Sequence, residues 1–171
     1  MKKILSILVR NRPGVLSHVA GLVTRRGYNV ESIAAGPTQD REVTRITLVT
    51  SGDARMLEQV TKQVNKLIDV INVEDLEHRE AMTGELALIT VSAEGVRRAE
   101  LLNLVTLLGL TLVDIREDSL TVMVSGSDMS VDMAVSGLAP FGIRAMARTG
   151  LVALARPVGS ILVQDKEDPW C

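Results

Sequence analysis

The chain has 171 residues, a formal net charge of −2, 46% hydrophobic residues and 23% charged residues. This balance is typical of one globular domain of ordinary size or of two small ones, and it excludes a largely disordered chain. Aromatic residues make up only 2% and the net charge is close to zero, so neither base stacking nor a basic surface for nucleic acid or anionic membrane is expected.

The first half of the sequence predicts six elements. The strands are short, rich in Ile, Leu and Val, and bounded by Gly or Pro, whereas the helices carry apolar residues at helical spacing. In chain order we expect a strand over 3–10, a helix from Pro13-Gly14 to Gly27, strands over 29–35 and 43–50, a helix opened by Asp53, and a strand over 70–76. The order βαββαβ is that of a ferredoxin-like unit, in which two helices cover one face of a four-stranded antiparallel sheet.

The second half predicts the same order. We expect strands over 85–92, 110–117, 120–126 and 143–148, and helices over 96–108 and 129–139. Gly14-Val15 and Gly95-Val96 both open a helix, which supports a repeat of two similar units in an α+β protein. We therefore expect an N-terminal unit over 1–78, a linker over 79–84, a C-terminal unit over 85–155 and a tail over 156–171. Within the tail, 161–163 is interpreted as an edge strand or a docking segment, although disorder is favoured.

Neither a membrane segment nor a disulfide framework is indicated. No run reaches the roughly 18 apolar residues of a membrane-spanning helix. The single cysteine, Cys171, cannot form a disulfide within the chain. This fits a reducing compartment, and we expect a cytoplasmic protein.

The sequence offers little for catalysis. It lacks cysteine pairs for a zinc cluster and the HExxH, GxSxG and Walker patterns. A proton-transfer group at 78–80 and a carboxylate metal site at Asp114, Glu117 and Asp118 are alternatives, but a solvated linker and a charged hairpin tip are the favoured interpretations. We therefore expect no catalytic residue, no metal site and no cofactor bound by this chain.

The turn Asn11-Arg12-Pro13-Gly14 predicts a binding site for a small anion. Pro13 fixes its own φ and suits the first helical turn, because it lacks an N–H group that would be unpaired there. Gly14 has no side chain, so the N–H groups of Gly14, Val15 and Leu16 are accessible. Helix N-terminal N–H groups favour a carboxylate.

A second amide lies at the start of the next strand. Asn11 and Asn29 each offer a donor and an acceptor, which suits a zwitterion. Leu16, Val30 and Ile33 would form apolar walls for an aliphatic side chain. The pattern describes a receptor for a small or branched aliphatic amino acid. The alternative is that Asn11 caps the helix and Asn29 completes a turn, and spacing alone does not separate the two.

Comparison of the halves restricts this site to the first. We expect Ser92 and Thr111 of the second half to correspond to Asn11 and Asn29 of the first, and Glu94 to replace Pro13. A negative side chain at that position opposes carboxylate binding.

Several segments resemble the small, regulatory subunit of acetolactate synthase, also called acetohydroxyacid synthase. They are Arg-Pro-Gly-Val-Leu at 12–16, Arg-Gly-Tyr-Asn-Val-Glu-Ser at 26–32 and Ala-Arg-Thr-Gly at 147–150, with further matches at 36–38, 57–60 and 66–70. The run 26–32 is specific, whereas 13–16 is typical of ACT domains in general. The resemblance covers roughly residues 1–155.

This resemblance implies an N-terminal ACT domain followed by a related ferredoxin-like domain. It also implies a homodimer whose ACT domains lie side by side and hold valine, or another branched-chain amino acid, at their interface. The implied effector contacts are Asn11, Gly14, Val15 and Leu16 of one chain and Asn29, Val30 and Ile33 of the other.

The resemblance further implies a regulatory function. The subunit would activate a separate catalytic subunit, which uses thiamine diphosphate, Mg²⁺ and FAD, and would confer feedback inhibition on it. His18 departs from the pattern, because Arg or Lys is expected there. The alternative is a free-standing ACT-domain sensor that acts on another enzyme or on a transcriptional regulator.

Overall fold

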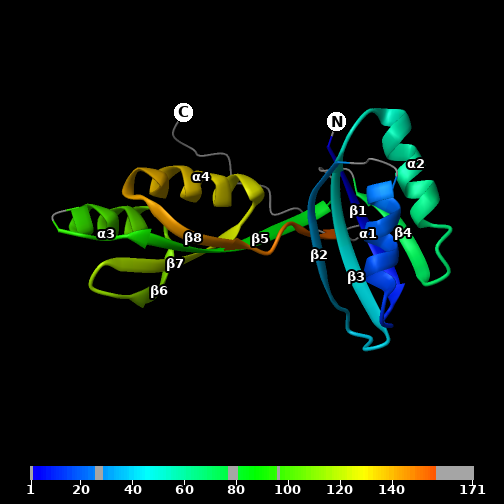
Figure 1. Cartoon of the computed structure of the whole chain (residues 1–171), viewed down its shortest axis with the longest axis horizontal. Helices are drawn as coiled ribbons and strands as arrows, with labels where there is room; N and C mark the ends of the chain where they lie inside the picture. The colour runs from blue at the N-terminus through cyan, green and yellow to red at the C-terminus, as the bar shows by residue number, and fades with distance from the viewer. Residues whose placement is uncertain (1, 26–28, 77–80, 96, 157–171) are drawn as a thin grey trace, which may run out of the picture.

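The computed structural model describes residues 2–25, 29–76, 81–95 and 97–156, which form two units side by side (Figure 1). The first unit contains β1 (Lys2–Arg10), α1 (Val15–Arg25), β2 (Asn29–Pro37), β3 (Val43–Ser51), α2 (Ala54–Val64) and β4 (Val70–Leu76). The second contains β5 (Ala81–Ser92), α3 (Arg97–Leu107), β6 (Thr111–Ile115), β7 (Ser119–Gly126), α4 (Asp128–Leu138), the short 3-10 helix η1 (Ala139–Phe141), β8 (Ile143–Arg148) and β9 (Val152–Ala155).

The two sheets have the same strand order. It is β2-β3-β1-β4 in the first unit and β6-β7-β5-β8 in the second, and every neighbouring pair is antiparallel. The edge strands β2 and β6 even carry a bulge at the equivalent place, after Val30 and after Leu112. The predicted α+β fold with two ferredoxin-like units is confirmed.

Each unit buries one face of its sheet beneath its helices. In the first unit the central strand β1 alternates, and every second side chain points into this core. The core residues are Leu5, Ile7, Val9, Val15, Val19, Val23, Ile46, Leu48, Val60 and Val64. Those of the second unit are Ala87, Ile89, Val91, Ala93, Leu101, Val105, Leu120, Val122, Val124, Val131, Ala134 and Leu138. Both buried clusters are entirely aliphatic, so spacing along each element, rather than aromatic anchors, defines the packing.

The join between the units differs from the sequence expectation. The predicted linker over 79–84 begins outside the described residues, but 81–84 form the start of β5, which we had expected to begin at Glu85. These residues pair with β9, a strand that the sequence did not predict. We call this pair the β5–β9 ribbon.

One face of the ribbon packs on the sheet of the first unit, on the side of that sheet that the helices do not cover. Ala81, Leu151 and Ala153 are buried there in one cluster with Ile4, Val49 and Leu76. The N–H group of Ala153 also donates to Thr47 Oγ1 at 3.4 Å. The ribbon was missed because its burial depends on a partner sheet far away in the sequence, which no local pattern reveals. The predicted tail beyond Arg156 lies outside the described residues.

Candidate functional site

The turn between β1 and α1 is braced by the hairpin that joins β2 to β3. The backbone N–H of Asn11 donates to Glu42 O at 2.7 Å, and its side-chain Nδ2 donates to Arg41 O at 2.9 Å. Asn11 therefore ties the turn to the hairpin and does not cap α1. The helix begins with the bond from His18 N–H to Gly14 O at 3.0 Å.

The first residues of α1 leave an open surface. Gly14 has φ of +87°, a conformation that side chains disfavour, and a Cβ built on it would meet nothing within 4 Å. In the described part of the chain, no group accepts a hydrogen bond from the N–H of Gly14 or Leu16. Leu16 is 47% exposed beside them. The turn thus presents free N–H donors next to an apolar side chain.

Asn29 lies at the other end of the same sheet. It pairs with Ser51, which pairs with Lys2 at the start of β1, whereas Asn11 follows the end of β1. Eight residues of strand place these ends about 26 Å apart. The Asn29 Nδ2 donates to Ser51 Oγ at 3.1 Å, and its carbonyl accepts from Thr50 Oγ1 at 2.7 Å.

The two apolar residues predicted with Asn29 lie on the helix-covered face. Val30 and Ile33 are partly buried and pack against the core of the first unit. Because a bulge separates them, these residues point to the same face although three positions apart. One chain therefore brings together Asn11, Gly14, Val15 and Leu16 at one end of the sheet and Asn29, Val30 and Ile33 toward the other.

The second unit lacks this arrangement. Its hydrogen bonds correct the sequence alignment by one residue: the N–H of Ala93 donates to Asp118 O, as the N–H of Asn11 donates to Glu42 O. The counterpart of Asn11 is therefore Ala93, which has no side-chain amide, and not Ser92. The shared bulges do align Asn29 with Thr111.

The acidic residues considered as a metal site form a charged hairpin tip. Asp114 pairs with Arg116 at 3.0 Å, and Asp118 pairs with Arg144. The hydrogen bond from Arg144 lowers the pKa of Asp118 below its ordinary value, with a further bond from Ser119. Among the described residues, no group of three or more His, Cys, Asp or Glu side chains is placed to hold a metal ion.

Other candidates from the sequence are unremarkable in the structure. His18 is exposed, and its Nδ1 lies 3.9 Å from Asp69 Oδ2. His78 lies outside the described residues. None of the helices in the described ranges is long and apolar enough to cross a membrane.

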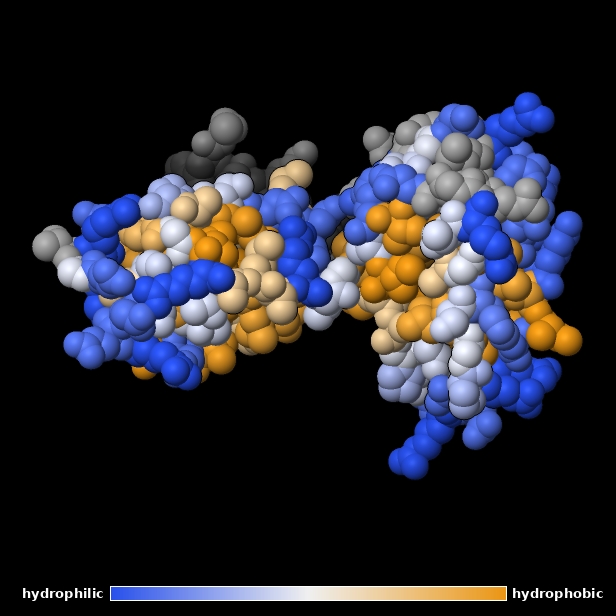
Figure 2. All heavy atoms as spheres, in the orientation of Figure 1, coloured by the Kyte–Doolittle hydropathy of each residue, from blue (hydrophilic) through white to orange (hydrophobic). Residues whose placement is uncertain are grey.

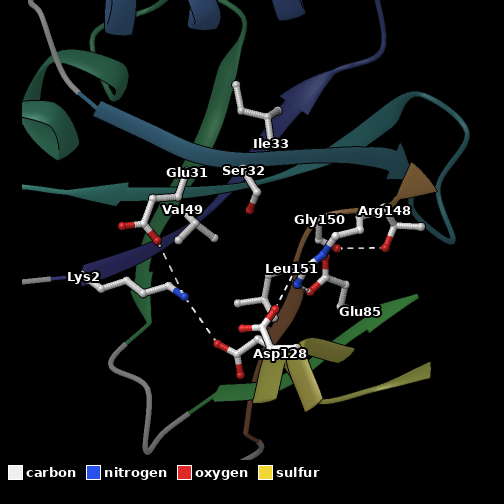
Figure 3. A pocket seen from close by; sticks show the side chains of 12 residues that line it. Lys2, Glu31, Ser32, Ile33, Val49, Glu85, Asp128, Arg148, Gly150 and Leu151 are labelled. Carbon is white, nitrogen blue, oxygen red and sulfur yellow. Dashed lines mark hydrogen bonds and ion pairs between the residues drawn. The ribbon is translucent and has the colours of Figure 1, made fainter. Parts of the chain in front are cut away.

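A polar cavity lies between the units, and no pattern in the sequence predicts it. It has a volume of about 520 Å³ and is lined from both units (Figure 3). Lys2 Nζ lies 3.7 Å from Glu31 Oε2 and 3.3 Å from Asp128 Oδ2. The link from Lys2 to Asp128 spans 126 positions, so no spacing rule could reveal it.

Two families of known proteins match successive parts of the chain. "AHAS small subunit-like ACT domain" matches residues 5–72, and "small subunit of acetolactate synthase" matches residues 84–157. The chain is 44% identical over 154 residues to a probable acetolactate synthase small subunit of Methanothermobacter thermautotrophicus, covering 90% of this chain and 92% of the relative. It is 40% identical over 157 residues to the acetolactate synthase small subunit of Bacillus subtilis, with 91% of each covered.

A solved structure matches nearly the whole chain. The crystal structure of the acetolactate synthase small subunit from Thermotoga maritima superposes with a TM-score of 0.84 at 30% identity. The match covers 92% of this chain and 98% of that one. The similarity therefore extends through both units.

Proposed function

Because the chain belongs to the family of acetolactate synthase small subunits, which are regulatory and not catalytic, we propose that it confers feedback inhibition by valine, or another branched-chain amino acid, on the synthase. The observation that carries this proposal is the open turn at the start of α1. Its free N–H groups suit the carboxylate of an amino acid, and exposed Leu16 suits an aliphatic side chain.

The site is completed by a second copy of the chain. β2 is an edge strand, paired only with β3 in the described residues, so its outer edge is open to another strand. A two-fold axis beside β2 pairs it antiparallel with its copy. That arrangement sets the Asn29 end of one β2 beside the Pro37 end of the other, where the Asn11 hairpin and the start of α1 lie.

The chemistry of the completed site fits a zwitterion. The N–H groups of Gly14 and Leu16 would bind the carboxylate, and the side-chain oxygen of the partner subunit's Asn29 would accept from the ammonium group. Leu16, with the partner subunit's Val30 and Ile33, would surround the side chain. Burial of a branched side chain contributes about 1.5–3 kcal/mol, which favours valine, leucine and isoleucine over alanine.

The regulated partner is the catalytic subunit of acetolactate synthase. The chain would activate it and make it sensitive to the effector, and the thiamine diphosphate, Mg²⁺ and FAD implied by the resemblance would belong to that subunit. Such a complex would act in the cytoplasm. Inhibition requires the effector to bind one state of the complex better than another, and a site at an interface between two chains supplies this difference.

Calorimetry of the purified chain with valine, leucine and isoleucine tests the proposal directly. We expect saturable heat for at least one of them, and Asn29→His and Gly14→Asp should each weaken it, the first by crowding the pocket and the second by opposing the carboxylate. The absence of heat with all three ligands would contradict amino-acid sensing. Failure to activate the catalytic subunit would instead favour a sensor that acts on another protein.

A further inference from the structure

Strand β2 faces two different surroundings at once. Val30 and Ile33 pack on the helix-covered side, where the effector is proposed to bind. Glu31 is the extra residue of the bulge, since Val30 pairs with Thr50 and Ser32 with Val49. The bulge turns Glu31 and Ser32 toward the polar cavity and the second unit (Figure 3).

The first contact between β2 and the second unit is made through Lys2, which lies at the start of β1. Its ammonium group lies between Glu31 on β2 and Asp128 in the first turn of α4 (Figure 3). The α4 N-terminus is held by Ser127, whose Oγ accepts from Ser130 N–H, so Asp128 has a defined position. A change in the position of Glu31 therefore alters the two ion pairs of Lys2, the one with Glu31 and the one with Asp128.

Gly150 forms the second contact. It lies in the turn between β8 and β9 with φ of +74°, and a Cβ built on it would stand 3.1 Å from Ser32 Cβ. Arg148, two residues earlier, anchors this turn in the second unit through Glu85, at 2.7 and 2.8 Å, and Asp132, at 2.8 Å. The backbone of the turn thus rests directly on β2.

The units meet at a narrow waist (Figure 2), and the polar cavity between them is lined by Lys2, Ser32 and Gly150, the residues of these two contacts. Units with a small common surface are expected to move relative to one another. We propose, resting on the effector site proposed above, that β2 transmits effector binding to the C-terminal unit through the Lys2 bridge and the Gly150–Ser32 contact. Removal of the Lys2 bridge, or crowding of the Gly150–Ser32 contact, then uncouples inhibition from binding.

The test compares valine binding with valine inhibition in the complex reconstituted from both subunits. Lys2→Met removes both ion pairs of the bridge. Gly150→Ala adds a methyl group against Ser32, and Gly109→Ala is its matched control, because Gly109 has φ of +64° but open space at its Cβ position. The double variant Gly150→Ala/Ser32→Gly removes the nearest atoms that the new methyl group meets.

We expect Lys2→Met and Gly150→Ala to bind valine with an affinity within about twofold of the unmodified chain, while the valine concentration for half-inhibition rises about fivefold or more. Gly109→Ala should behave as the unmodified chain, and Ser32→Gly should restore inhibition to Gly150→Ala. An unchanged inhibition in either variant, or an equal loss in Gly109→Ala, overturns the proposal. If the unmodified chain binds no valine, the proposed function itself fails and this inference with it.

Discussion

At the scale of single residues, two arginines organise the charges of the second unit. Arg148 holds Glu85 with two hydrogen bonds, and the Glu85 residue is only 8% exposed. This contact, followed by the one with Asp132, raises the pKa of Arg148. Arg144 binds Asp118 and Glu94 at the hairpin tip, where all three side chains are accessible to solvent. Loss of the arginine partner should therefore cost more stability at buried Glu85 than at exposed Asp118 or Glu94, because an unpaired carboxylate is more costly when it is buried.

Arg148→Met should lower the free energy of unfolding by about 2 kcal/mol, because it leaves the carboxylate of Glu85 buried without its partner. The exposed part of Arg148 keeps the effect below that of a fully buried pair. Urea denaturation measures this change in the free energy of unfolding. Adding Glu85→Gln in the same chain should recover part of the loss, and a single-variant cost equal to that of the double variant would refute this account.

Asp118 should titrate below the ordinary aspartate pKa of about 3.9, because Arg144 stabilises its charged form. A lowered pKa in the folded state adds stability above the unfolded pKa, and this stability disappears as the pH falls through the folded value. We expect Arg144→Gln to return the pKa toward the ordinary value in an NMR titration. Arg116→Gln is the control, since Arg116 bonds mainly Asp114, and an equal shift in both would argue against the assignment.

At the scale of elements, β9 decides how the units are joined. Neighbouring residues of this segment have opposite surroundings: Leu151 is 4% exposed against the first unit, whereas Val152 is 52% exposed. The ribbon is a short two-stranded element, which is marginal on its own. Its order therefore depends on the sheet beneath it.

Leu151→Ala should destabilise the packing of the ribbon by about 2–4 kcal/mol, the usual cost of removing a buried leucine side chain. Val152→Ala is the matched control, and we expect it to change stability by less than about 0.5 kcal/mol. Hydrogen exchange at the amides of 81–84 and 152–155 measures the difference locally. Equal protection in both variants would mean that the ribbon does not depend on this contact.

At the scale of the whole molecule, the proposed sensor is a property of two chains. The two groups of predicted site residues lie toward opposite ends of one sheet, and the proposed antiparallel copy across β2 would bring them together. A monomer would therefore hold two separate half-sites.

Mixing two defective variants tests this directly. In a dimer of one Gly14→Asp chain and one Asn29→His chain, one site carries both changes and the other carries neither. A co-refolded equimolar mixture should thus recover about a quarter of the valine sites by calorimetry, although each variant alone binds weakly. No recovery in the mixture, with mixed dimers shown by mass spectrometry, would place both residues in a site within one chain.

Much of the fold could be predicted from the sequence, because apolar periodicity is local. The repeated βαββαβ order follows from spacings such as Val15, Val19 and Val23, which need no knowledge of a partner. The start of β5 and all of β9 could not be predicted. Residues such as Ala81, Met82 and Val152 form strands because the two segments pair with each other and pack on a sheet that is distant in the sequence.

The candidate site, like the fold, could be predicted from the sequence only in part. The chemistry of the turn at Asn11–Gly14 is readable from residue types, since Pro, Gly and Asn constrain or equip the backbone locally. Its geometry is not: Asn11 binds the β2–β3 hairpin instead of capping α1, and Asn29 lies at the far end of the sheet. Strand register sets these distances, and register depends on contacts between strands.

The sequence by itself determined the α+β class, the repeat and the residue types suited to an amino acid, because these depend on periodicity and on backbone chemistry within a few positions. Only the tertiary structure decided that Lys2 bridges to Asp128, that Gly150 rests on Ser32, and that one chain keeps the two halves of the predicted site apart. Those facts depend on long-range packing, in which residues more than a hundred positions apart become neighbours.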